Sequence, residues 1–246
     1  MVAHLDGLLD IAAFDDYGPN GLQVPGPAET GLVVTGVSAH LELFERAAAL
    51  GAGLVICHHG LFWRSQSRAI SPQLKRRLEV LFDADIALAA YHLPLDAHPE
   101  LGNNALICRE LGLEPAEPFG EAAGRSIGFV GVAEPPITAS DLVARCGRAF
   151  GRDPLVFGPV DRRIARVGVV SGGGASSLAG AIELDLDALV TGEPSEPAMA
   201  DAAEGQVTFV AGGHYATETF GVRALGELLA ERFGVEHTFV AVRNPV

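Results

Sequence analysis

The stretch Leu54-Val55-Ile56-Cys57-His58-His59-Gly60 joins a continuous apolar run to two histidines and a glycine. Short runs of this kind are typical of strands that are buried on both faces, as in parallel sheets. Another apolar stretch, Leu32–Val37, precedes it, and the intervening segment Leu41–Leu50 has the pattern of a helix. This strand-helix-strand unit predicts an α/β fold, in which polar side chains at strand ends face a common crevice.

The same alternation continues along the chain. Ser71 and Pro72 provide the N-cap and first position of a helix. Further strands are expected over 86–90, 164–170, 188–190, 207–211 and 238–242, and helices over 72–82, 104–111, 176–182, 195–203 and 216–233. Because the second half of the chain repeats the alternation of strands and helices seen in the first half, we predict two similar α/β repeats, 1–120 and 121–246. Prolines and glycines over 115–125 mark the seam between them.

Composition restricts the function. With 48% hydrophobic residues and 20% charged residues, the 246-residue chain is globular rather than disordered. Its net charge of −14 argues against a nucleic-acid groove, which requires a basic stripe. The three cysteines are widely spaced and form no CxxC pair, which excludes a zinc ribbon. We see no signal peptide or membrane-spanning stretch, and expect a cytoplasmic protein.

The two histidines after the first strand are candidate metal ligands. Adjacent strand residues face opposite sides, so His58 and His59 can reach one site only if the chain turns by Gly60. The alternative is that one of them hydrogen-bonds a neighbouring loop.

A second cluster, Gly212–Glu218, follows another apolar run. His214 and Glu218 are four residues apart, which places both side chains on one face of a helix's first turn. Glu218 would also favour the positive end of the helix dipole, so its position has two explanations.

The third cluster is His92-Leu93-Pro94-Leu95-Asp96. Since Pro94 rules out a continuous helix, we expect an extended segment with His92 and Asp96 on one side. Asp96 is the expected ligand, with a turn-capping role as its alternative, and His92 is expected to orient a ligand or carry protons. His98 could serve the site or be incidental.

Several other polar features are weaker. The run Ser171–Ser176 could form an anion nest, but a plain tight turn is favoured over a dinucleotide site because Ser177 occupies the third glycine position. Glu193 is expected to line the crevice as a proton carrier or support. We interpret the remaining features as structural or exposed: Cys57 as a buried thiol, 16–24 as a loop entering a strand, and His4, His40 and His237 as side chains without ligand-type neighbours.

Taken together, four motifs closely resemble the Nif-three-like dinuclear metal-centre family, also known as GTP cyclohydrolase I type 2 homologues. They are Asn20-Gly21-Leu22-Gln23-Val24, Cys57-His58-His59-Gly60-Leu61-Phe62-Trp63, His92-Leu93-Pro94-Leu95-Asp96 and Gly213-His214-Tyr215-x-Thr217-Glu218. The motifs keep the family's order over nearly the whole chain. The chain is similar to the family's short form, which lacks an inserted domain.

The resemblance implies two interlocked α/β repeats with mixed sheets flanked by helices, and a toroidal homohexamer. It also implies two divalent metal ions per subunit, of which Fe, Zn and Mn suit this donor set. Its ligands here would be His58, His59, Asp96, His214 and Glu218. The expected activity is metal-dependent hydrolysis of a nucleotide or related small molecule, with a non-catalytic metal-binding scaffold or regulatory hexamer as the alternative.

Overall fold

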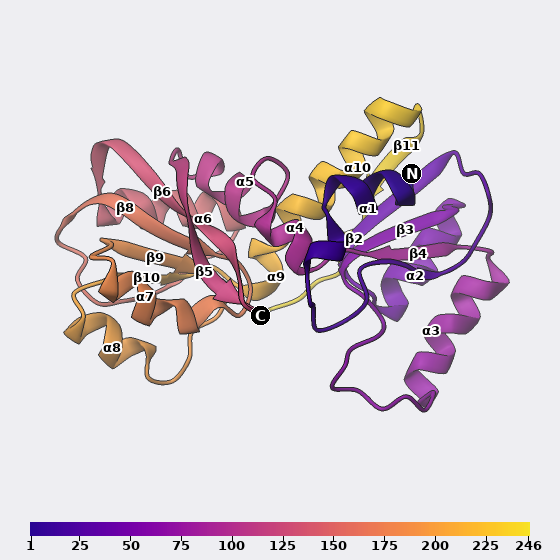
Figure 1. Ribbon diagram of the computed structural model, residues 1–246, viewed down its shortest axis with the longest axis horizontal. Coiled ribbons are helices and arrows are strands. Elements are labelled where there is room, and N and C mark those ends of the chain that lie inside the picture. Colours follow the sequence, from indigo (N-terminus) through magenta and orange to yellow (C-terminus); the bar gives the residue numbers. More distant parts are fainter. The chain divides into compact units, whose positions relative to one another are not determined.

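The computed structural model describes residues 1–246, and their contacts form two compact units. The first unit contains Met1–Leu95 and Gly221–Arg243, and the second contains Asp96–Phe220 and Asn244–Val246. Each unit has a mixed sheet flanked by helices, which confirms the predicted α/β class (Figure 1). No helix is both long enough and apolar enough to cross a membrane.

The sheet of the first unit has the strand order β1-β4-β3-β2-β11. Four of its strands are parallel, and β1 pairs with β4 in the antiparallel direction. Because β3 lies at the centre, its side chains are buried on both faces, as its unbroken apolar run predicts. The strands are β1 (Gly21–Val24), β2 (Leu32–Ser38), β3 (Leu54–His59), β4 (Ala87–Ala90) and β11 (Glu236–Phe239).

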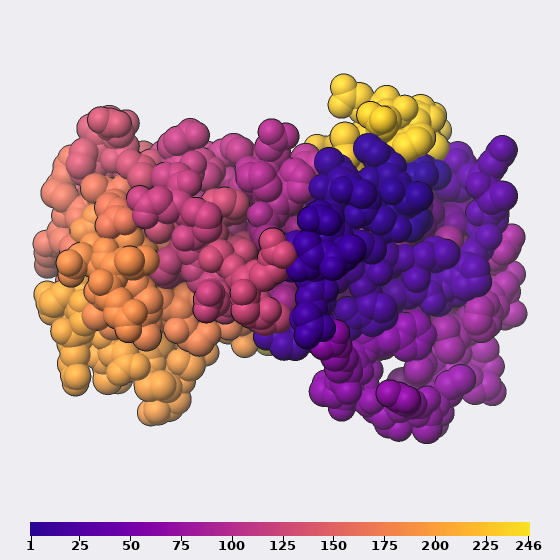
Figure 2. Space-filling view, in the orientation of Figure 1, coloured from indigo at the N-terminus to yellow at the C-terminus, as the bar shows by residue number.

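Helices cover both faces of this sheet (Figure 1). On one face, Leu43 and Phe44 pack with Val34 and Val55 in a buried cluster. On the other face, the helix Thr219–Phe233 lies beside the helix Val2–Leu8. Figure 2 shows the first of these in yellow and the second in indigo. The helices are α1 (Val2–Leu8), the 3-10 helix η1 (Ile11–Ala13), α2 (Leu41–Leu50), α3 (Pro72–Asp83) and α10 (Thr219–Phe233).

The predicted start of α3 is confirmed. Ser71 Oγ accepts a hydrogen bond of 3.1 Å from Leu74 N, and Pro72 occupies the first helical position. The cap satisfies one of the amides that a helix start leaves without a partner.

The sheet of the second unit has the order β5-β6-β8-β9-β10-β7. Its central strands β8, β9 and β10 are parallel, whereas β5, β6 and β7 are antiparallel. The strands are β5 (Glu114–Ala122), β6 (Arg125–Thr138), β7 (Leu155–Phe157), β8 (Arg163–Val170), β9 (Ala188–Thr191) and β10 (Thr208–Ala211). The helices are α5 (Asn103–Glu110), α6 (Ala139–Phe150), the 3-10 helix η2 (Gly174–Ser177), α7 (Leu178–Glu183), α8 (Ala198–Glu204) and α9 (His214–Thr217).

The unit boundaries differ from the predicted 1–120 and 121–246. The chain enters the second unit at Asp96 and returns to the first at Gly221. The return is required because β11 pairs in parallel with β2, with Glu236 opposite Leu32. A strand near the C-terminal end of the chain could be predicted from its local pattern, but its pairing with β2 could not.

The predicted seam over 115–125 is part of an antiparallel hairpin. β5 pairs with β6 through partners such as Phe119 and Gly128. Ala123 and Gly124 have φ values of 49° and 76° at the turn, the left-handed conformation that tight hairpin turns need. The prolines and glycines therefore mark an edge strand and its turn rather than a linker.

Two helical segments also differ from expectation. The long helix expected over 216–233 is divided at Glu218, between α9 and α10. The segment expected to be extended is the short helix α4 (Leu93–Ala97). Pro94 lies in its first turn, where the missing N–H would have had no helical partner, so the extended prediction was wrong.

Candidate metal centre

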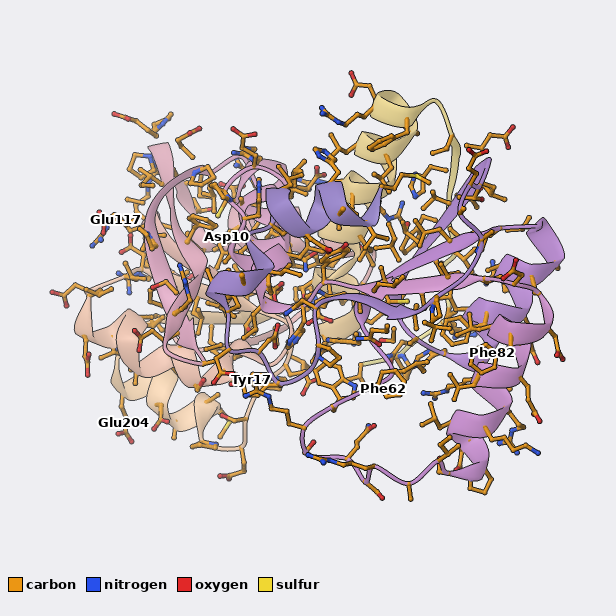
Figure 3. The ribbon with its side chains drawn as sticks, turned by 45° about the vertical axis from the view of Figure 1, so that its right-hand side comes forward. Asp10, Tyr17, Phe62, Phe82, Glu117 and Glu204 are labelled. Carbon is orange, nitrogen blue, oxygen red and sulfur yellow. The ribbon has the colours of Figure 1, made fainter.

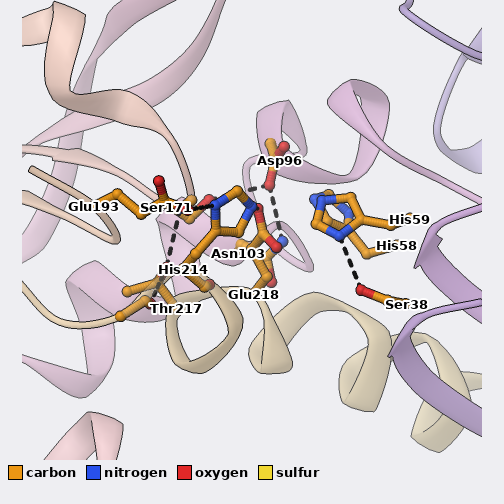
Figure 4. A network of polar contacts seen from close by, with 12 residues as sticks. Ser38, His58, His59, Asp96, Asn103, Ser171, Glu193, His214, Thr217 and Glu218 are labelled. Atoms are coloured by element: carbon orange, nitrogen blue, oxygen red, sulfur yellow. Dashed lines mark hydrogen bonds and ion pairs between the residues drawn. The ribbon is translucent and has the colours of Figure 1, made fainter. Parts of the chain in front are cut away.

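The end of β3 supplies the two adjacent histidines. His58 is fully buried, and its Nδ1 lies 2.9 Å from the Tyr91 carbonyl oxygen. Since a carbonyl only accepts, Nδ1 carries the proton and Nε2 is the nitrogen with a lone pair. His59 Nδ1 is held similarly, 3.1 Å from Ser38 Oγ (Figure 4). The strand ends at His59, before Gly60, and the two rings lie 4.8 Å apart at their centroids.

His92 joins these two residues. One ring nitrogen from each of His58, His59 and His92 lies within 4.8 Å of the others, a group that could hold a metal ion. We call these residues the histidine cluster. His92 was expected to orient a ligand, whereas its ring here lies beside the two expected ligands.

Asp16 fixes the orientation of His92. Its Oδ1 accepts from His92 Nδ1 at 2.7 Å, and its Oδ2 accepts from Leu93 N and Asn20 Nδ2, both at 2.9 Å. Asn20 Oδ1 accepts from His92 N in turn. Burial acts to raise the pKa of Asp16, but bonds from His92, Asn20 and Tyr17 outweigh it and lower this pKa below its ordinary value. The carboxylate is therefore held ionised, and the loop before β1 has a specific role that its turn signals did not reveal.

Replacing Asp16 by Asn tests this role. Asn offers one acceptor oxygen in place of two, so at least one buried donor loses its partner. We expect a loss of about 2–3 kcal/mol in the free energy of unfolding, measured by urea titration in EDTA so that metal does not contribute. The neighbouring Asp15→Asn is the control: its side chain is 80% exposed and pairs with Arg64, so this change should leave the urea midpoint of unfolding close to that of the native protein. Equal effects of the two variants would contradict the positioning role.

The second unit holds the expected carboxylates. Asp96 is 4% exposed, and its Oδ1 accepts from Asn103 Nδ2 at 2.8 Å and from Ser171 Oγ at 3.2 Å. Glu218 is 3% exposed, and its Oε1 lies 3.0 Å from His214 Nε2. The break between α9 and α10 therefore preserves the predicted proximity of His214 and Glu218.

His214 is bracketed by two acids. Its Nδ1 hydrogen-bonds Glu193, on the loop after β9, while Nε2 faces Glu218 (Figure 4). Burial disfavours the charged ring, but hydrogen bonds and charge from Glu218 and Glu193 outweigh it and raise the pKa of His214 to about 9. Glu193 therefore contacts a predicted ligand, and its role as a support or proton carrier stays a prediction.

The glycine run after β8 shapes this part of the site. Gly172 has a φ of +60°, and a Cβ there would lie 2.2 Å from Glu218 Oε1 and 3.1 Å from His214 Nε2. Its amide donates to Thr217 Oγ1, and its carbonyl accepts from the amides of Gly192 and Glu193. The backbone groups of Gly172 thus bind the protein itself, in agreement with the tight turn favoured from sequence.

Other residues considered from sequence have structural surroundings. His98 Nδ1 accepts from the amides of Glu100 and Leu101. Burial raises the pKa of the Cys57 thiol, which lies in the apolar core. Of the remaining histidines, His4 contacts the Phe233 ring and His40 precedes α2. The His237 ring forms a hydrogen bond with Thr35 Oγ1.

Sequence reasoning missed four side chains that orient residues of the candidate site: Ser38, Asp16, Asn103 and Ser171. Asn103 is seven residues from Asp96 in the chain, whereas the other three come from distant segments. A local signal existed only for Asp16 and Asn20, whose four-residue spacing in a turn-rich loop allows their side chains to meet.

The side chains present fit metal ions of the Fe, Zn or Mn type. Imidazole nitrogens and carboxylate oxygens are the donors these ions accept. Each of the four histidines has its Nδ1 held by an oxygen, and this is the arrangement that fixes the ring of a metal-binding histidine.

Comparison with known proteins gives a consistent result. A family model described as Duf34/NIF3 (NGG1p interacting factor 3) matches residues 1–245. A Pseudomonas aeruginosa protein named GTP cyclohydrolase 1 type 2 homolog is 40% identical over 245 residues, covering 100% of this chain and 97% of its own length. An Escherichia coli protein of the same name is 41% identical over 244 residues, covering 96% and 94%.

Solved structures show the same fold. A structural-genomics structure of the protein ybgI, described as of unknown function, has a TM-score of 0.92 and 39% identity, covering 100% of this chain and 98% of that one. The Thermus thermophilus protein TTHA1606 has a TM-score of 0.89 and 37% identity, with the same coverage.

Proposed function

Because the chain belongs to the Duf34/NIF3 family, we propose that it is a metal-dependent hydrolase with a centre of two divalent metal ions. His58 and His59 of the first unit and Asp96, His214 and Glu218 of the second would be the ligands. The observation that carries the proposal is the donor set itself, in which every imidazole and the Asp96 carboxylate is oriented by a further polar group.

The residues around the ligands have distinct tasks in this proposal. When bound, such ions polarise a substrate oxygen and lower the pKa of a bound water. Asp16 holds His92 at the edge of the cluster, where its imidazole can exchange a proton with substrate. Glu193 is 40% exposed in its side chain and holds His214, so it can pass protons between this ring and solvent. Asn103 and Ser171 keep the Asp96 carboxylate in place.

The substrate class is part of the proposal. Relatives at about 40% identity carry the name GTP cyclohydrolase 1 type 2 homolog. For this chain we propose a nucleotide or related small molecule whose negative charge the metal ions offset.

Metal analysis tests the proposed centre. Elemental analysis after reconstitution should find two divalent ions per chain in the native protein. His58→Ala and His214→Ala should each lower metal affinity by at least about 100-fold, because each removes a ligand. His4→Ala, which alters a ring contact with Phe233, is the control and should keep both ions.

Activity separates hydrolysis from a scaffold role. Hydrolysis of nucleotides or model phosphoesters that is lost in both ligand variants supports the enzyme. Full metal occupancy without turnover across a broad panel would favour the non-catalytic scaffold. A protein that binds no metal after reconstitution would contradict both functions.

The assembly is proposed from the family resemblance, as a homohexamer. Light scattering should then give a mass of six chains of 25.6 kDa each, and a smaller particle at micromolar concentration would contradict it.

A further inference from the structure

Three aromatic side chains gather beside the histidine cluster in the first unit. The Trp63 ring centroid lies 5.1 Å from that of His92, and the Tyr17 centroid lies 6.2 Å from it. Tyr17 is 50% exposed and Phe62 36% exposed, and Figure 3 shows both in the lower middle of the view, with Tyr17 to the left of Phe62. Exposed rings next to a polar site can stack on a flat ligand. We call Tyr17, Phe62 and Trp63 the aromatic rim.

The loops that carry the aromatic rim are fixed to each other. Arg64 N donates to the Tyr17 carbonyl at 2.8 Å, and Leu61 N donates to Gln23 Oε1 at 2.8 Å. A Cβ on Gly18 would lie 2.4 Å from the Phe62 carbonyl, so only glycine allows this approach. The rings are therefore preorganised, which reduces the entropy that ligand binding would cost.

A narrow crevice separates the aromatic rim from the cluster. Its walls include Gly18, Gln23 and Trp63, together with His58 and His92. The space inside is about 10 Å³, room for about one water molecule. A flat ligand would therefore lie across the mouth of the crevice, against the exposed rings, and would not enter it.

The chain continues from the aromatic rim into a strongly basic segment. Residues 64–78 contain five of the chain's 17 Lys and Arg residues and no Asp or Glu, although the whole chain has a net charge of −14. Arg64 itself hydrogen-bonds the Tyr17 loop through its amide, and its guanidinium pairs with Asp15, 80% exposed. An uninterrupted positive segment in an acidic protein favours an anionic group of a ligand at this place.

We propose that the first unit binds a nucleoside phosphate, with its base stacked on the aromatic rim and its phosphate on the start of the basic segment, which contains Arg64 and Arg68. The proposal rests on the proposed function, because it names the substrate class and the binding residues of the same site. The base accounts for the exposed rings, and the phosphate accounts for the positive charge of residues 64–78. Polynucleotides are disfavoured by the net charge of the rest of the chain.

The fluorescence of Trp63 provides a direct test, because it is the only tryptophan of the chain. The full-length protein is titrated with guanosine and adenosine monophosphates, once after EDTA treatment and once loaded with Zn²⁺. Each nucleotide should change the Trp63 emission saturably. Guanosine without phosphate and ribose 5-phosphate without a base should each bind at least about tenfold more weakly.

Matched variants assign the two halves of the ligand. Tyr17→Ala should weaken nucleotide binding about tenfold, whereas Phe82→Ala, a 61% exposed ring on α3, should leave it unchanged. The double variant Arg64→Gln/Arg68→Gln should abolish the preference for the phosphorylated ligand. Arg232→Gln, an exposed arginine near the end of α10, should retain that preference.

Each outcome decides something. Metal uptake without any nucleotide-dependent change at millimolar concentration would overturn this proposal and leave the metal centre intact. Nucleotide binding by a protein that takes up no metal would overturn the proposed hydrolase and leave this site intact. Tighter binding of a single-stranded oligonucleotide, by more than about tenfold over the mononucleotides, would overturn the small-ligand assignment.

Discussion

Gly172→Ala should abolish high-affinity metal binding by the second unit. The added Cβ would lie 2.2 Å from Glu218 Oε1, far inside van der Waals contact, and the φ of +60° is unfavourable for alanine. Glu218 is 3% exposed and cannot move away without leaving its position beside His214. We expect at least about a 100-fold loss of metal affinity and a loss of about 2–4 kcal/mol in the free energy of unfolding.

Gly173→Ala is a control one residue away. A Cβ on Gly173 meets nothing within 4 Å, and its backbone needs no positive φ. This variant should bind metal and unfold like the native protein in calorimetry. A Gly172→Ala protein with normal metal affinity would show that Glu218 is not held where a ligand is needed.

The central strands could be predicted because their sequence pattern is local. β2 and β3 are mostly apolar and almost wholly buried, as strands of a sheet covered on both faces are expected to be. β5 lies at a sheet edge, is mostly exposed and contains Pro115 and Pro118, so its composition indicated a linker. Pairing with β6 supplies its stability, and pairing is a long-range property.

The same division applies to the site. His58, His59, His214 and Glu218 could be selected because each follows a recognisable strand end or helical spacing. Asp16, which orients His92, could not be selected, because the two residues are 76 positions apart in the chain and meet only in the folded protein. The conformation around Pro94 was also predicted wrongly. Proline is compatible both with an extended segment, which was expected, and with the first turn of a helix, which is what the structure has.

The second large effect concerns the pH dependence of metal binding. Metal ions bind the unprotonated imidazole, but Glu218 and Glu193 raise the pKa of His214 to about 9 in the metal-free protein. Binding at pH 7 must therefore displace a proton. If His214 is a ligand, apparent metal affinity should rise about tenfold per pH unit below pH 8 and about 50-fold in all from pH 7 to pH 9, where half of the rings are still protonated.

Calorimetry in buffers of different ionisation enthalpy measures this proton directly. At pH 7 the native protein should release about one proton from His214 on metal binding. Glu193→Gln removes one of the two acids that raise the pKa, so it should release fewer protons and show a weaker pH dependence. Glu196→Gln, an exposed residue on the same loop, is the control and should behave like the native protein.

The metal-free protein should show the same linkage in its stability. Because the pKa of His214 is about 9 in the folded state and about 6.5 when unfolded, protonation stabilises the folded state. This contribution is fully present below pH 6.5 and is lost as the pH rises through about 9, and it amounts to about 3 kcal/mol at most. Urea titrations in EDTA at pH 6 and pH 9.5 should detect the loss, and His214→Gln should remove it. The contrary result is a metal affinity and a stability that both stay constant between pH 6 and pH 9.5. It would show that His214 is already neutral in the metal-free protein, and that Glu193 and Glu218 do not raise its pKa.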